Sequence, residues 1–333
     1  MTPGRLVAIV GGAAALVLIA VLVAGASSGD TSSGDASSGD STPGKTAVRA
    51  QVPAAGVASL QSELGALPEP AGASRVDLAK PSLLSGFRLK APSAGLAFDL
   101  ADGSVLWRRN ATRRHPIASL TKMMTGLLAV ERLAPGDRVR ITRGADRVGG
   151  SRMGGLRVGR TVPAEILLKG LIISSSNDAA VALAVAGAGS ERAWVRLMNR
   201  RARLLGLRCT KYVDPHGLNP RDRSCPADLA VLAMRAMAEP RIARIARKRQ
   251  ARVWPGSGKK LTLRTTNHLL RERYAGAIGL KTGFTNAAGR CLVAVIQRGS
   301  QRIGIVLLHD RNPWQSARRI THAAVRAGVF PRA

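Results

Sequence analysis

The sequence predicts an α+β domain over residues 86–333, and two patterns indicate this fold class. Near both ends of the region apolar and polar residues alternate, as in strands, whereas in the middle apolar residues recur every three to four positions, as in helices. Strands at both ends with helices between them predict a sheet assembled from segments that are distant in the chain. The chain is 45% hydrophobic but 3% aromatic, so its core would be mostly Leu, Val, Ile and Ala.

The elements are expected in the following order. "AGLAFDLADGSVLWRR" at 94–109 alternates around Asp102-Gly103, which predicts a β-hairpin. An apolar helix begins near Ser119, and helical periodicity returns in four later segments, 162–174, 178–187, 190–207 and 226–239. "GLKTGF" predicts a strand, "RCLVAVIQRGSQRIGIVLL" a hairpin and "PWQSARRITHAAVRAGV" a final helix.

The region before residue 86 has a different character. Leu6 to Ala26 contains no charge and is long enough to span a bilayer, and "AGA" at 24–26 resembles a signal-peptidase site. We therefore expect residues 1–26 to be a signal peptide or an N-terminal membrane anchor, and the only part of the chain in contact with the membrane. Residues 27–85, with a repeated Ser-Ser-Gly-Asp and an Ala/Pro-rich stretch, predict a disordered tether. The folded domain would then be extracytoplasmic, secreted or anchored, and face the cell wall.

The formal net charge of +31 indicates anionic partners. Export removes nucleic acid from consideration, and anionic cell-wall polymers remain possible partners. The basic run "RIARIARKRQAR" at 241–252 is interpreted as a solvated helix face rather than as a polymer site.

Three cysteines, Cys209, Cys225 and Cys291, leave one unpaired in a compartment that permits disulfides. We hypothesise that Cys209 and Cys225 pair and close a loop around His216, which would leave Cys291 free in a core strand, although the sequence alone does not settle the pairing. The arrangement C-x6-H-x8-C is no familiar zinc spacing, and there is no H-E-x-x-H motif. We predict no metal and no cofactor.

Ser119 and Lys122 stand three positions apart in "ASLTKMMT", at the predicted start of a helix. This spacing places both side chains on one helix face, within reach of a shared proton. A serine hydroxyl is a weak nucleophile at neutral pH, and a lysine acts as a base only where burial or a nearby cation lowers its pKa. Taken alone, the pair favours a capping serine and a solvated lysine.

Two further motifs change this interpretation. "IISSSNDAA" places Ser175 and Asn177 at a junction of two helical segments, and "GLKTGF" carries Lys281 and Thr282 on a predicted strand. Each is weak alone, because Ser175 could be an ordinary helix cap. In this order, however, S-x-x-K, S-x-N and K-T-G are the motif set of the serine penicillin-recognising enzymes.

The residues around these motifs narrow the resemblance. "PIASLTKMMT", "LLKGLIISSSNDAA", "LGLRCTKYVDPHGL", "PADLA" and "GLKTGFTNAAG" resemble the low-molecular-mass D-alanyl-D-alanine carboxypeptidases, from about residue 90 to about residue 328. The resemblance implies a β-lactamase/transpeptidase-like fold: a five-stranded antiparallel sheet flanked by helices, an all-helical subdomain, and the active site in the cleft between them. It also implies that Ser119 forms an acyl-enzyme with peptidoglycan stem peptides ending in D-Ala-D-Ala, removes the terminal D-alanine, and is acylated by β-lactam antibiotics.

The same resemblance implies roles for the other catalytic residues. Lys122 would be the base, and the charge of Lys281 across the cleft would lower its pKa. Ser175 would relay a proton to the leaving amine.

Five residues would bind substrate. Asn177 would hold the substrate amide and Lys122, and Lys281 with Thr282 would bind the terminal carboxylate. Gly283 would permit a close backbone approach, and the N–H groups of Phe284 and the nucleophilic serine would hold the oxyanion.

Some features depart from relatives and leave alternatives open. Many relatives have an aspartate where Ile278 stands, and some have an arginine near Thr266, so the preferred stem peptide stays open. A β-lactamase shares the fold and motifs, but we find no E-x-x-L-N segment to supply its glutamate. A D,D-endopeptidase is a further alternative. A non-catalytic wall-binding protein would not need the intact serine and lysines.

Overall fold

The computed structural model describes residues 75–256 and 259–332. The predicted N-terminal segment and the Ser-Ser-Gly-Asp repeats lie outside the described residues. Within the described part of the chain, no helix is both long enough and apolar enough to cross a membrane. Packing begins slightly before residue 86, because Leu84 is buried and its N–H donates to the Leu106 carbonyl at 2.8 Å.

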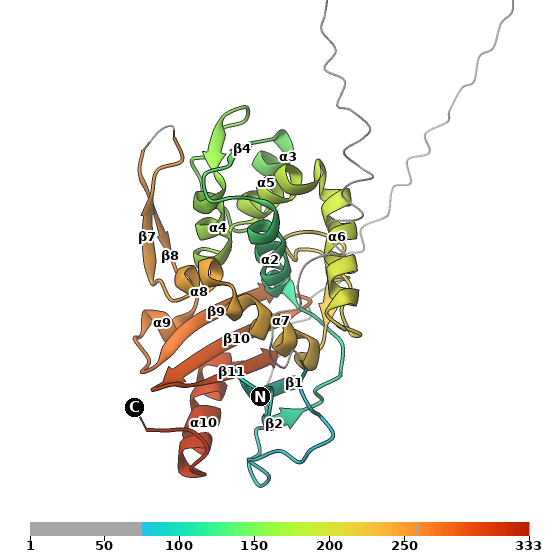
Figure 1. The fold of residues 1–333 in the computed structure, drawn as a ribbon, viewed down its shortest axis with the longest axis vertical. Coiled ribbons are helices and arrows are strands. Elements are labelled where there is room, and N and C mark those ends of the chain that lie inside the picture. The colour runs from blue at the N-terminus through green and yellow to red at the C-terminus, as the bar shows by residue number, and fades with distance from the viewer. Residues whose placement is uncertain (1–74, 257–258, 333) are drawn as a thin grey trace, which may run out of the picture. The chain divides into compact units, whose positions relative to one another are not determined.

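A five-stranded antiparallel sheet is the centre of the domain (Figure 1). Its order is β2-β1-β11-β10-β9, so the first hairpin joins the last strands, and Ala94 pairs with Leu308. The strands are β1 (Ala94–Asp99), β2 (Val105–Arg109), β9 (Ala277–Thr285), β10 (Gly289–Arg298) and β11 (Gln301–Leu308). The predicted fold class, including a sheet assembled from distant segments, is confirmed.

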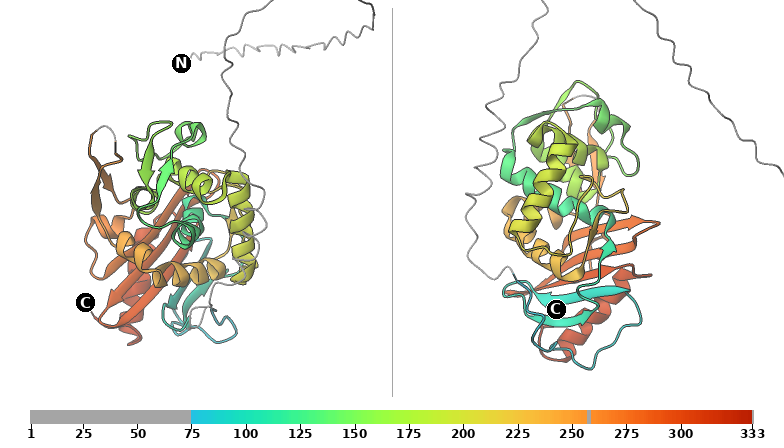
Figure 2. Two further views of the ribbon diagram at one scale, coloured as in Figure 1. Left: turned by 45° about the horizontal axis from the view of Figure 1, so that its top comes forward. Right: turned by 90° about the vertical axis from the view of Figure 1, so that its right-hand side faces the viewer.

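The sheet is apolar on both faces. Consecutive residues of its central strands point to opposite sides, and in β10 and β11 both sets are apolar and buried. Leu292, Ala294 and Ile296 of β10 pack with Ala317 and Ile320 in one core cluster. Those two residues belong to α10 (Pro313–Arg326), which covers this face (Figure 2). The intervening β10 residues Val293 and Val295 belong to the other core cluster, which extends into the helical part of the molecule.

The helical part carries the remaining large elements, and they agree closely with the predicted segments. Its helices are α2 (Lys122–Arg132), α3 (Arg143–Arg147), α4 (Ala164–Ile173), α5 (Asn177–Ala188), α6 (Glu191–Leu204), α7 (Pro226–Ala238) and α8 (Pro240–Ala246). The sequence explains α5 directly, since its first eight residues, mostly Ala, Val and Leu, are all buried, as expected for the part of a helix that is packed on all sides.

Three small two-stranded sheets accompany the central sheet and the helices in the described part of the chain. They pair β3 (His115–Pro116) with β6 (Arg223–Ser224), β4 (Arg138–Arg140) with β5 (Thr161–Pro163), and β7 (Gln250–Val253) with β8 (Leu261–Arg264). The predicted helix over 241–252 is therefore wrong in its second half: α8 ends at Ala246, and 250–253 alternates as a strand. Even the helical half is not simply solvated, because Ile242 and Ile245 are buried.

The hypothesised disulfide is present between Cys209 and Cys225, with a Cα–Cα distance of 5.6 Å. Cys291 is free and buried in β10, as expected, and burial raises the pKa of its thiol to about 12. Asp228 lies beside the two bonded sulfurs, but sulfurs joined in a disulfide are not thiolate ligands, so this cluster is not a metal site.

Candidate active site

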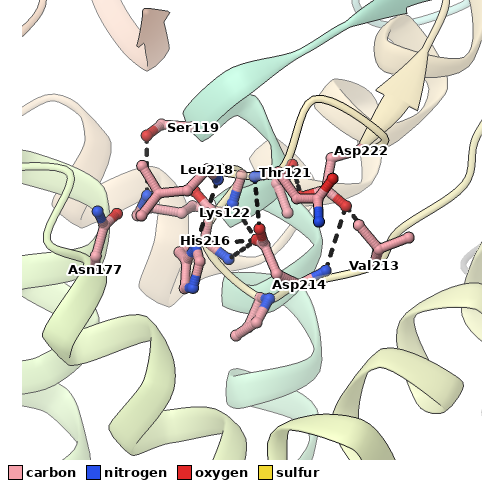
Figure 3. Close-up of polar contacts among 12 residues, drawn as sticks. Ser119, Thr121, Lys122, Asn177, Val213, Asp214, His216, Leu218 and Asp222 are labelled. Atoms are coloured by element: carbon pink, nitrogen blue, oxygen red, sulfur yellow. Dashed lines mark hydrogen bonds and ion pairs between the residues drawn. The ribbon is translucent and has the colours of Figure 1, made fainter. Parts of the chain in front are cut away.

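Ser119 and Lys122 are brought together at the start of the first long helix. Ser119 lies in the short 3-10 turn η1 (Ala118–Thr121), and Lys122 is the first residue of α2. The Lys122 Nζ lies 2.9 Å from Ser119 Oγ and donates to the His216 carbonyl at 2.6 Å (Figure 3). Lys122 has no solvent exposure, whereas Ser119 is only half-buried. The serine is thus open to a ligand while its lysine partner is enclosed.

Burial changes the chemistry of Lys122. Loss of water around the ammonium lowers the pKa of Lys122 to about 7, although the charges of Asp214, Asp222 and Asp178 act in the opposite direction. A lysine with this pKa is substantially neutral at physiological pH. It can therefore accept the proton of the neighbouring hydroxyl.

Lys281 faces this pair from β9 and is 1% exposed. Its Nζ donates to Ser175 Oγ at 2.8 Å and to the Thr282 carbonyl at 2.9 Å. Burial first, and then the positive charge of Lys122, lowers the pKa of Lys281 well below its usual value. We expected the charge of Lys281 to be the reason for the low pKa of Lys122, but in the structure the main cause is burial.

Ser175 and Asn177 lie at the turn between α4 and α5, as the sequence predicts. Ser175 is buried and takes a positive φ of 60°, a conformation that is rare for a residue with a side chain. Asn177 begins α5, and its Nδ2 donates to the Gly149 carbonyl at 2.7 Å. Its Oδ1 is buried and, among the described residues, has no hydrogen-bond partner. The expected contact from Asn177 to Lys122 is thus replaced by one to Gly149, and the free Oδ1 could accept a hydrogen bond from a ligand.

The K-T-G strand passes directly beside the nucleophile. A Cβ on Gly283 would lie 2.9 Å from the Ile117 carbonyl oxygen and 3.2 Å from the Ser119 nitrogen, so only glycine permits this approach. Thr282 Oγ1 lies 2.6 Å from Thr266 Oγ1. Phe284 is 62% exposed at the end of the motif.

These residues surround one cavity of about 310 Å³. Ser119, Ser175, Thr282, Gly283 and Phe284 line it, whereas Lys122, Asn177 and Lys281 are buried next to it. The other lining residues, none of which we predicted as site residues, are Ser151, Thr266, His268, Arg290, Cys291 and Trp314. Ser151 and Thr266 lie in loops and the others lie near the start of a strand or helix, and no motif marks any of them as a site residue.

A turn at residues 214–219, which we did not predict, lies beside Lys122 and binds its ammonium (Figure 3). Asp214 accepts hydrogen bonds from the N–H groups of His216 at 2.8 Å, of Asn219 at 2.8 Å, and of Gly217. These bonds fix the turn whose His216 carbonyl receives the lysine. The string "DPHG" was the available signal, because aspartate, proline and glycine at these spacings are typical of turns.

Two carboxyl groups in this turn have opposite behaviour. Burial raises the pKa of Asp214, but its hydrogen bonds with His216 and Gly217 outweigh burial and hold the pKa below its usual range. Burial, together with the charge of Asp214, raises the pKa of Asp222 to about 8. Asp222 is therefore largely protonated at neutral pH, and of these two carboxyl groups Asp214 carries the negative charge.

The fold and this site together define a serine hydrolase of the penicillin-recognising class. Residues 84–312 match the family model described as D-alanyl-D-alanine carboxypeptidase, and the chain belongs to this family.

Individual relatives agree with this assignment. The chain is 34% identical over 225 residues to the D-alanyl-D-alanine carboxypeptidase DacF of Bacillus subtilis, an alignment covering 66% of this chain and 57% of that protein. It is 32% identical to a D-alanyl-D-alanine endopeptidase of Pseudomonas aeruginosa, covering 66% and 71%. A mutant of the Streptomyces K15 DD-transpeptidase superposes with a TM-score of 0.67 at 29% identity, covering 72% of this chain and 100% of that structure.

Proposed function

We propose that this chain is a serine-type D-Ala-D-Ala carboxypeptidase acting on peptidoglycan stem peptides. The observation that carries the proposal is the half-buried Ser119 with the enclosed, low-pKa amine of Lys122 at 2.9 Å. The family match supports the substrate, and the cavity beside Ser119 is bordered by groups suited to a peptide with a terminal carboxylate.

In the acylation step, Lys122 accepts the proton of Ser119 as Oγ attacks the carbonyl carbon of the peptide bond between the two D-alanines. The oxygen of that carbonyl becomes negative and is held by the backbone N–H groups of Ser119 and Phe284. Ser175 donates its proton to the departing amine and recovers one from Lys122. The C–N bond breaks, D-alanine leaves, and an ester joins the rest of the peptide to Ser119.

Lys281 and Thr282 bind the terminal carboxylate in this scheme. A lysine amine whose pKa is lowered by its site regains its proton more readily when an anion binds beside it. Substrate carboxylate and the proton on Lys281 therefore stabilise each other. Hydrolysis completes the cycle: neutral Lys122 takes a proton from water as the water oxygen attacks the ester carbon, the bond from that carbon to Ser119 Oγ breaks, and Oγ recovers its proton from Lys122 as the shortened peptide leaves.

The first test concerns the covalent intermediate. Full-length protein incubated with a fluorescent penicillin should form a stable adduct at Ser119, because the retained ring blocks the approach of water and the sequence contains no E-x-x-L-N glutamate to activate it. A synthetic peptide ending in D-Ala-D-Ala should lose one D-alanine, as measured by mass spectrometry. Ser119→Ala should abolish both results.

The outcomes separate the alternatives. Rapid multiple-turnover hydrolysis of penicillin without an adduct would favour a β-lactamase. Cleavage of crosslinked peptides in preference to the linear peptide would favour the endopeptidase activity named for the Pseudomonas relative. If folded protein performed neither reaction, the result would favour a non-catalytic wall-binding protein.

We also propose that the domain works outside the cytoplasmic membrane, with the uncharged Leu6 to Ala26 segment as export signal or anchor. The substrate class and the net charge of +31, which suits anionic wall polymers, support this location. Protease added to intact spheroplasts should digest the domain. Its survival until the cells are lysed would contradict the proposed location.

A further inference from the structure

A second cavity, of about 630 Å³, is lined by residues adjacent in the chain to those of the active site and is bordered by four arginines. It is lined by Arg249, Gln250, Arg264, Thr265, Arg271 and Arg273. They come from the β7–β8 pair and the residues next to it in the chain, and from α9 (His268–Arg271) with the turn that follows it. All four arginines are solvent-exposed, so their guanidinium groups can be reached by a ligand.

The positive charge here is not balanced locally. Among residues 75–256 and 259–332, none of these four guanidinium groups makes a side-chain hydrogen bond or an ion pair. Glu272 is the one acidic residue between Pro240 and His309, and it contacts Arg318 and lies 3.9 Å from His268. Four cations around one hollow repel each other, and an anion placed among them relieves this repulsion.

The cavity is joined to the active site by a short length of chain. Thr265 lines the basic cavity, whereas the next residue, Thr266, lines the catalytic cavity and contacts Thr282 at 2.6 Å. In α9, His268 lines the catalytic cavity and Arg271 the basic one. The arginines therefore lie on the Thr266 and Thr282 side of the active site, which in the proposed function holds the terminal carboxylate of the leaving group.

The backbone at Arg273 is a further unusual feature. The Tyr274 N–H donates to the Leu269 carbonyl at 2.8 Å and the Arg273 N–H to the Leu270 carbonyl at 3.2 Å, which is a Schellman ending of α9. The residue at this position takes φ 53°, where glycine is favoured. The chain thus has an arginine where local stability prefers a glycine, which is explained if the side chain has a function.

We propose that this four-arginine cavity is an anion subsite that binds carboxylate or phosphate groups of wall polymer on the leaving-group side of the catalytic serine. The placement on that side rests on the proposed function. Guanidinium groups suit both ligands because they present paired N–H donors that match carboxylate and phosphate oxygens.

The first experiment compares two peptide substrates that differ by one charge. Both end in D-Ala-D-Lys, with the lysine side-chain amine carrying either a succinyl group, which is anionic, or an acetyl group, which is neutral. Full-length protein should cleave the succinyl peptide with the higher kcat/KM, mainly through a lower KM. Raising the salt concentration should reduce this preference, because it screens exposed charges.

The variants locate the effect. Arg264→Gln together with Arg271→Gln should lower the succinyl to acetyl ratio by about two- to fivefold for each lost pairing. Arg273→Gly should lower the ratio while leaving the thermal midpoint unchanged or higher. The matched control is Arg192→Gln with Arg196→Gln on α6, on the opposite side of the helical region in Figure 1, which should leave the ratio unchanged.

A second experiment distinguishes the source of the anion and needs no catalysis. A fluorescent glycerol phosphate oligomer is titrated with the same four proteins and followed by anisotropy. Binding that weakens in the cavity variants but not in the α6 control assigns phosphate polymer to the subsite, and a variant-dependent peptide ratio assigns stem-peptide carboxylate. If neither measurement distinguishes the cavity variants from the control, the proposal is wrong. Failure to cleave either peptide would instead count against the proposed function.

Discussion

Replacing Lys122 by methionine is expected to lower the rate of Ser119 acylation by about a thousandfold, the contribution of a well-placed general base. Methionine keeps a similar length and an apolar stem but cannot accept the serine proton. Stopped-flow measurement of penicillin acylation would determine this rate. A loss of less than tenfold in a folded variant would mean that another group deprotonates the serine.

The pH dependence of the acylation rate is a second test of Lys122 as the base. In the wild type, acylation should rise with pH through about 7 as Lys122 becomes neutral, and fall at the pH where Lys281, with the ligand carboxylate bound beside it, loses its proton. The rising limb should disappear in Lys122→Met.

The stability of Lys122→Met at different pH values shows whether the variant is folded. The unfolded chain binds a proton at Lys122 up to its ordinary pKa of 10.5, whereas the folded protein loses that proton near 7. The buried lysine therefore costs most stability below pH 7, and this cost declines as pH rises from 7 towards 10.5. Lys122→Met should gain stability relative to the wild type at pH 6 and gain less at pH 10, as measured by chemical denaturation.

Replacing Gly217 by alanine is expected to displace the nucleophile and to destabilise the domain by about 3 kcal/mol or more. Gly217 has φ 87°, and a Cβ there would lie 2.0 Å from the Ala118 carbonyl oxygen and 3.0 Å from the Ser119 nitrogen. Because both contacts are with backbone, no side chain can move aside. The acylation rate should fall at least a hundredfold, since small misplacements of reacting groups have effects of this size.

Gly206→Ala is the matched control for this substitution. Gly206 has a similar φ of 69°, but a Cβ there would meet nothing within 4 Å. It should therefore cost only about 1 kcal/mol, from the unfavourable backbone conformation alone, and leave acylation unaffected. Equal losses in the two variants would show that the contact with η1 has no influence on the site.

The sequence predicted the parts of this protein that depend on periodicity or on a motif. β10, with a continuous apolar run buried on both faces of the sheet, and α7, with its helical apolar periodicity, lie where these patterns predict them. Ser119, Lys122, Ser175 and Lys281 meet as the three motifs imply.

What the sequence did not predict depends on contacts between distant segments. β7 is short and overlaps the arginine-rich run 241–252, so its charges resembled those of a solvated helix. The hydrogen bond from Lys122 Nζ to the His216 carbonyl depends on where the backbone of that turn lies, which the residue types alone do not reveal. The dominance of burial in lowering the pKa of Lys122 became visible only from its complete enclosure.

The order of strands in the sheet has a consequence for how the protein is made. Ala94 cannot pair with Leu308 until nearly the whole domain has been synthesised, so β1 waits with one unpaired edge while the helices form behind it. Pairing over such sequence distances is slow and leaves partly folded chains prone to association. We expect the nascent chain to need protection until β11 emerges, and the catalytic cleft to assemble late in folding, because β9 must dock beside η1 to complete it.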